Sequence, residues 1–81
     1  MKTIRFEDKK NIISEKVREE RGRLGISQEQ LAAKLQTMGV SNDQQAISKI
    51  ERNARIVTDY ELFCLAKIFN ITVDSFFDNI S

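Results

Sequence analysis

Two glutamines and a lysine in the stretch Asp43–Asn53 are the side chains best suited to reading DNA bases. The stretch has the sequence Asp-Gln-Gln-Ala-Ile-Ser-Lys-Ile-Glu-Arg-Asn. A glutamine amide can form two hydrogen bonds with adenine, and a lysine can donate to the acceptors of guanine. Gln44 and Gln45 would lie in the first turn of a helix, the part that contacts base edges when a helix enters the major groove. The pattern therefore points to recognition and not to catalysis.

The other residues of this stretch predict an amphipathic helix over residues 43–53. Asp43 can cap it, because its carboxylate can accept hydrogen bonds from the N–H groups of the first turn. Ala46, Ile47 and Ile50 fall on one helical face. The opposite face carries amides, a hydroxyl and cations, which can either contact a ligand or simply be solvated, as most such faces are. The rest of the chain has to decide between these alternatives.

Length and composition favour one all-helical domain. The chain has 81 residues, of which 41% are hydrophobic and 31% charged, an ordinary globular mixture, and it contains no proline. The net charge of +1 does not indicate a strongly basic nucleic-acid protein. The charge is uneven, however, with +3 over residues 1–26, +1 over residues 27–57 and −3 over residues 58–81. Such a distribution would orient the molecule on a polyanion.

The residue types give no support for an enzyme or a cofactor site. The chain has no histidine, a single cysteine and no glycine-rich phosphate loop, and its carboxylates are scattered. The same absences argue against a metal site. Cys64 lies in an apolar run, which predicts a buried, reduced thiol. With no recognisable signal peptide or membrane-length apolar segment, we expect a cytoplasmic protein that does not bind membranes.

Periodicity and capping signals predict five helices after an N-terminal arm. The arm would be residues 1–8, and the domain residues 9–78. Ser27 with Gln30, and Thr58 with Glu61, fit capping boxes. Glycines 22, 25 and 39 are expected to end helices, as is Asn70, and Thr72 to cap the last one. The charged run that includes Glu20 predicts a solvated face. The expected helices are residues 9–22, 27–38, 43–53, 58–70 and 73–78.

Three segments of the chain resemble the Xre-like (Cro/phage-repressor type) helix-turn-helix family. They are Ser-Gln-Glu-Gln-Leu-Ala-Ala-Lys-Leu at 27–35, Ala-Ile-Ser-Lys-Ile-Glu-Arg-Asn at 46–53, and Leu-Ala-Lys-Ile-Phe-Asn-Ile-Thr-Val-Asp-Ser-Phe at 65–76. Each segment alone is a weak motif, but their order and spacing are fairly specific. The resemblance covers residues 12–77 and implies a compact five-helix, lambda-repressor-like domain. It further implies a regulator of transcription, a repressor, that binds specific sites in double-stranded DNA.

The same resemblance implies a role for individual residues. The positions that match base-reading residues are Gln44, Gln45 and Lys49. The positions that match contacts to the DNA backbone are Gln28, Ser48, Arg52 and Asn53, with Arg55 near a phosphate or the minor groove. Arg21 and Glu51 match a structural ion pair between the first helix and the recognition helix.

The connection between the second and third helices departs from the family pattern. The family usually has a tight, glycine-containing turn here, whereas this chain has the longer segment Gln-Thr-Met-Gly-Val-Ser-Asn at 36–42. Either the second helix gains a turn, with Met38 and Val40 covering the core, or the connection bulges. The outcome bears on where the recognition helix starts, and hence on Asp43 and Gln44.

Two further alternatives concern partners. A single module reads few base pairs, so a homodimer on a two-fold related site is expected. Tyr60, Phe63, Phe76 and Phe77 either form that dimer surface, or another partner surface, or close the bottom of the core. The near-neutral charge and the long connection also suit a different function, a protein-interaction module or antitoxin-like adaptor on the same fold with little or no DNA binding.

Overall fold

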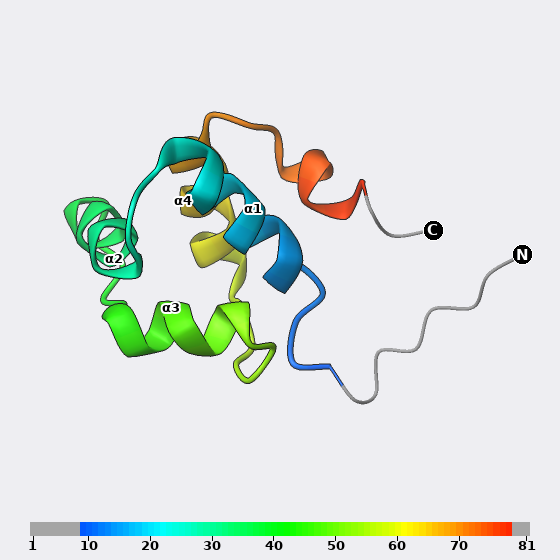
Figure 1. The fold of residues 1–81 in the computed structure, drawn as a ribbon, viewed down its shortest axis with the longest axis horizontal. Helices are drawn as coiled ribbons and strands as arrows, with labels where there is room; N and C mark the ends of the chain where they lie inside the picture. The colour runs from blue at the N-terminus through cyan, green and yellow to red at the C-terminus, as the bar shows by residue number, and fades with distance from the viewer. Residues whose placement is uncertain (1–8, 79–81) are drawn as a thin grey trace, which may run out of the picture.

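Helical segments account for most of residues 9–78, the part of the chain that this computed structural model describes (Figure 1). They are α1 (Ser14–Leu24), α2 (Gln28–Thr37), α3 (Gln44–Glu51), α4 (Asp59–Phe69) and the 3-10 helix η1 (Val73–Phe77). The all-helical class is confirmed over these residues, which contain no strand. The count of five α-helices is wrong, because the last segment is a short 3-10 helix. The expected arm, residues 1–8, lies outside the described residues, as do residues 79–81.

Side-chain caps fix where most of the helices begin. Ser27 Oγ accepts from the Gln30 N–H at 3.0 Å, and Gln30 Oε1 accepts from the Ser27 N–H at 2.7 Å. Thr58 and Glu61 form the same reciprocal pair at the start of α4. Thr72 accepts from the first turn of η1. These caps satisfy N–H groups that would otherwise lack partners, and each was predicted from the sequence.

Left-handed residues mark where helices stop. Gly25 (φ 68°) follows α1 and Asn70 (φ 57°) follows α4, both as predicted. Gly39 (φ 87°) comes directly after the last turn of α2. Gly22 was expected to share in ending the first helix, but it lies inside α1.

The predicted start of the first helix is also wrong, because α1 begins only after Ile13. The preceding residues are held in an irregular conformation by a contact distant in sequence. Asn53 Oδ1 accepts hydrogen bonds from the backbone N–H groups of Lys10 and Asn11, both at 2.9 Å. In addition, the Ile13 N–H donates to Asn11 Oδ1 at 3.1 Å, so it does not make the bond to the carbonyl of residue 9 that a helix beginning there would need.

All four α-helices contribute to one core, together with η1 and the α2–α3 connection. Cys64 is buried and unpaired, as predicted. The rings of Phe69 and Phe76 pack with their centroids 6.3 Å apart. The buried apolar residues are Ile13, Val17, Leu31, Ala32, Leu35, Val40, Ile47, Ile50, Cys64, Leu65, Ala66, Phe69 and Phe76.

The long connection combines both alternatives left open by the sequence. α2 continues past Leu35 to Thr37, and an irregular segment then leads to α3. Val40 enters the core, whereas Met38 is 40% exposed. The Gln36 side chain donates to the carbonyl of the buried Asn42 at 3.0 Å, which fixes the segment to α2. In Figure 1 the connection meets one end of α3, and α3 forms the lower edge of the fold with no other described helix beyond it.

Candidate functional site

The polar side of α3 faces solvent. Ile47 and Ile50 are fully buried, and through them α3 packs against α1 and α2. The exposed side chains on the other side are Gln44, Gln45, Lys49 and Arg52, with Ser48 half-buried among them. Arg52 Nε donates to Ser48 Oγ at 3.3 Å. The long connection therefore leaves free the side of α3 that the sequence singled out.

Asp43 sets the start of this helix. Its Oδ1 accepts from the Ala46 N–H at 2.9 Å, so the predicted N-cap is confirmed. Gln44 is consequently the first residue of α3 and Gln45 the second. Both amides project from the first turn, where the helix end would meet a groove.

A buried carboxylate joins α3 to α1. Glu51 is 4% exposed. Its Oε2 accepts a hydrogen bond from Arg21 Nε at 2.7 Å, and its Oε1 accepts one from Arg21 Nη2 at 3.1 Å. Arg21 Nη1 donates to the carbonyl of Ile26 at 2.9 Å, so all three guanidinium nitrogens are engaged. The hydrogen bond to Glu51 raises the pKa of Arg21 above its ordinary value, although burial alone would lower it. The planar, two-pronged contact fixes the rotation of α3 about its own axis.

The same carboxylate also orients the start of α2 and of α3. Gln28 Nε2 donates to Glu51 Oε1 at 3.1 Å, and Gln28 Oε1 accepts from Gln44 Nε2 at 3.4 Å. Arg21, Glu51, Gln28 and Gln44 thus form a continuous chain of hydrogen bonds across three helices. Gln28 was expected to contact a phosphate. In the structure both ends of its side-chain amide form hydrogen bonds within the protein, one to Glu51 and one to the exposed Gln44.

Asn53 holds the N-terminal segment beside α3. Its backbone is left-handed (φ 59°), and its Oδ1 receives the two N–H groups described above. In return Asn11 Nδ2 donates to the carbonyls of Ile50 at 3.1 Å and Arg55 at 2.9 Å. Sequence reasoning missed Asn11, because one asparagine before two isoleucines gives no periodic or motif signal. We call these hydrogen bonds of Asn11 and Asn53 the clasp. The clasp places the exposed Lys10 next to the C-terminal end of α3.

Arg55 is turned toward α4. Its Nη1 lies 3.0 Å from Glu61 Oε1 and 2.9 Å from Oε2, and Glu61 is only 1% exposed. Glu61 Oε1 also accepts from the Thr58 N–H at 2.8 Å. Burial would raise the pKa of Glu61, but the Arg55 guanidinium and the Thr58 N–H outweigh it and hold that pKa below its usual value. Arg55 therefore does not extend toward solvent as Lys49 and Arg52 do.

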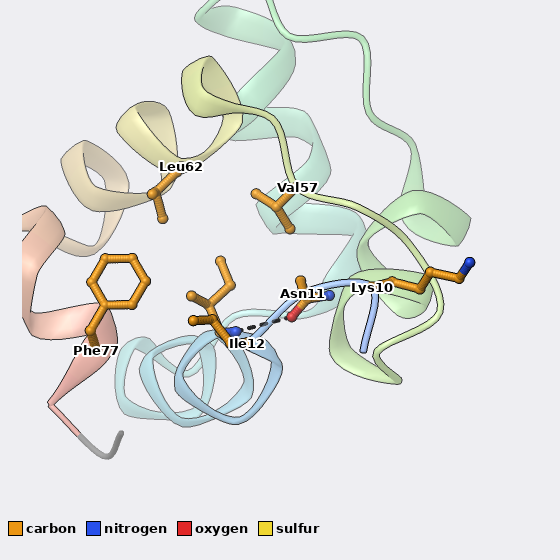
Figure 2. Close-up of a pocket in the computed structure, with 7 residues that line it drawn as sticks. Lys10, Asn11, Ile12, Val57, Leu62 and Phe77 are labelled. Carbon is orange, nitrogen blue, oxygen red and sulfur yellow. Dashed lines mark hydrogen bonds between the residues drawn. The ribbon is translucent and has the colours of Figure 1, made fainter. Parts of the chain in front are cut away.

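An open hollow lies beside the clasp and has a volume of about 200 Å³. Figure 2 shows the side chains of Ile12, Val57, Leu62 and Phe77 facing a common space, with the amino group of Lys10 directed away from it. Asn11 Oδ1 is occupied by the Ile13 N–H at 3.1 Å. The hollow thus offers apolar contact and no acid–base pair. Over residues 9–78, no group of three or more His, Cys, Asp or Glu is placed to hold a metal ion.

Comparison with known proteins gives one match. The sequence model of a family described as helix-turn-helix matches residues 17–76, more than half of the chain. No curated protein and no solved structure matches the chain. None of the helices within residues 9–78 has the length and apolar character needed to cross a membrane.

Proposed function

The chain belongs to the Xre-like (Cro/phage-repressor type) helix-turn-helix family, and we propose that it represses transcription by binding specific sites in duplex DNA. The observation that carries the proposal is the solvent-facing polar side of α3, held at a fixed rotation by the Arg21–Glu51 contact. Repression would follow from occupancy of the site alone, with no covalent chemistry.

Base discrimination is assigned to Gln44, Gln45 and Lys49. All three are exposed, and their amide and ammonium groups match the edges of adenine and guanine in the major groove. The bond from Gln44 to Gln28 limits the rotamers that the Gln44 amide samples before DNA arrives. Ordering it in advance reduces the entropy lost on binding.

Contacts to the DNA backbone are assigned to Ser48, Arg52 and the start of α2. Because the Gln28 side chain is bonded to Glu51 and Gln44, the contact there is assigned to the backbone N–H groups of the first turn. Such contacts supply affinity and make it fall as salt rises. Asn53 and Arg55 are each engaged within the chain, and we assign to them the positioning of the loop after α3. Their contribution to binding would be indirect, through the angle at which α3 is presented.

A second candidate function is a protein-interaction module on the same fold. Tyr60 and Phe63 favour it, because they are 59% and 54% exposed on the outer side of α4. A chain of this kind would bind another protein through α4 and show no preference among DNA sequences.

Selection of bound sites from a pool of random duplex DNA separates the two functions. The proposal expects enrichment of one short sequence that recurs twice in inverted orientation, with a centre-to-centre spacing of about 10 base pairs or a multiple of it. The same pool passed over a Gln44→Ala/Gln45→Ala/Lys49→Ala variant is the matched control. Enrichment of no sequence by the wild-type chain would exclude sequence-specific binding and leave the interaction module.

A further inference from the structure

The outer side of α4 carries two large aromatic side chains between opposite charges. We call Asp59, Tyr60, Phe63 and Lys67 the α4 face; all four are exposed, whereas Leu65 on the other side is fully buried. Lys67 Nζ lies 5.3 Å from the centroid of the Phe63 ring. Two large exposed rings side by side form more than the single scattered apolar residues that are normal on a surface, and this makes the α4 face a candidate interaction surface.

The structure narrows the aromatic surface considered from the sequence. Phe76 is 2% exposed and packs on Phe69 in the core, so for this residue the core alternative is confirmed. Phe77 lines the apolar hollow near Leu62 (Figure 2). Tyr60 and Phe63 are the two aromatics of this group that lie on α4, and at 59% and 54% they are more exposed than Phe77 at 36%.

We propose that the α4 face binds a second copy of the chain, with the two α4 helices antiparallel and a two-fold axis at Phe63. Asp59 lies about one turn before Phe63 and Lys67 about one turn after it, on the same exposed side. A two-fold axis at Phe63 reverses the helix direction in the second copy. Asp59 of each copy then meets Lys67 of the other, and the two Phe63 rings meet at the axis.

The order of the charges selects this occupant and this orientation. A parallel arrangement in register would set Asp59 against Asp59 and Lys67 against Lys67, which like-charge repulsion disfavours. The antiparallel arrangement turns both contacts into ion pairs. A surface that is complementary to itself in this way needs no second protein. This dimer would let the proposed regulator bind a two-fold related DNA site. Only that use of the dimer rests on the proposed function, whereas the pairing of the two α4 faces does not.

Charge exchange tests the pairing directly. Asp59→Lys gives a chain with lysine at both positions, and Lys67→Asp gives a chain with aspartate at both. Each variant alone is expected to raise the dimer dissociation constant at least about tenfold in sedimentation equilibrium without DNA. An equimolar mixture of the two should return to near wild-type dimerisation, because every lysine then meets an aspartate. Phe63→Ser, which leaves the charge unchanged, should also weaken the dimer.

Matched controls lie on α2. Glu29 lies in the first turn of α2 and Lys34 in its last turn, as Asp59 and Lys67 do on α4, and both are exposed. Glu29→Lys and Lys34→Asp, alone or mixed, should leave the dimer unchanged, and circular dichroism melts should show that every variant is folded. A wild-type chain that stays monomeric, or a mixture no more dimeric than its components, would overturn the inference. Because α3 is untouched, site selection still succeeding in that case would leave the proposed function standing.

Discussion

Arg21→Ala is expected to lower the free energy of unfolding by about 3–5 kcal/mol, because it strands the buried Glu51 carboxylate without a cation. Glu51 is 4% exposed, and of its three side-chain donors only Gln28 would remain. Arg21→Lys should recover only part of the loss, since an ammonium cannot reproduce the two parallel bonds. Urea unfolding followed by circular dichroism measures the difference.

Two variants control for the loss of an arginine as such. Arg18→Ala removes an exposed arginine from the same helix and should change stability by no more than about 0.5 kcal/mol. The double variant Arg21→Met/Glu51→Met removes both charges and should regain most of the stability, because no buried charge is left unpaired. The buried-pair explanation fails if Arg21→Ala and Arg18→Ala unfold at the same urea concentration.

The triple variant Gln44→Ala/Gln45→Ala/Lys49→Ala is expected to bind the selected DNA site about 100-fold or more weakly than the wild-type chain. A well-formed contact to a base edge contributes about 1–3 kcal/mol of discrimination, and this variant removes all three. Binding to a scrambled duplex should change far less, because Arg52 and the phosphate contacts remain. Electrophoretic shift assays with both duplexes give the ratio.

Lys34→Ala is the matched control for the lost cation, since Lys34 is an exposed lysine on the neighbouring helix. It should leave both affinities near those of the wild-type chain. If the triple variant loses affinity equally for the selected and scrambled duplexes, then α3 contributes charge to binding but does not discriminate among bases.

Local chemistry explains why so many helix boundaries were predictable. A cap acts within four residues. The starts of four helices could therefore be predicted without any knowledge of the fold, from Ser27, Asp43, Thr58 and Thr72. The burial of Cys64 and the outward side of α3 followed from helical periodicity in the same way.

Contacts between distant residues explain what was missed. Nothing near Asn11 signals its bonds to the loop after α3 or the bond that its Oδ1 accepts from the Ile13 N–H, and α1 begins only after Ile13. Glu20 lies in a charged run that predicted a solvated face, yet it is 5% exposed. The Glu20 carboxylate lies 2.6 Å from Arg23 Nε and 3.4 Å from Lys16 Nζ, and these two cations compensate its charge. Burial would raise the pKa of Glu20, but the two cations outweigh burial and hold that pKa below its usual value. Arg23 in turn donates to the carbonyl of Phe69, the last residue of α4, at 2.7 Å, and a contact between residues so far apart in the sequence gives no local signal.

Among the site residues, too, local features were predictable and contacts between distant residues were not. Exposure of Lys49 and Gln45 could be read from one helix alone. The engagement of Arg55 with Glu61 could not, because Glu61 gave only a capping signal in the sequence. The Arg21–Glu51 pair was inferred from the resemblance to the family, and no local pattern of charges indicated it.

Methylation interference on the selected site is the most direct test of the claim that α3 lies in the major groove. Dimethyl sulfate modifies guanine at N7, on the major-groove edge, and adenine at N3, on the minor-groove edge. We expect N7 methylation at the guanine facing Lys49 to block binding of the wild-type chain but to have little effect on Lys49→Ala, whose binding is already weaker. Interference confined to adenine N3, or at guanines that Lys49→Ala leaves equally sensitive, would contradict the account.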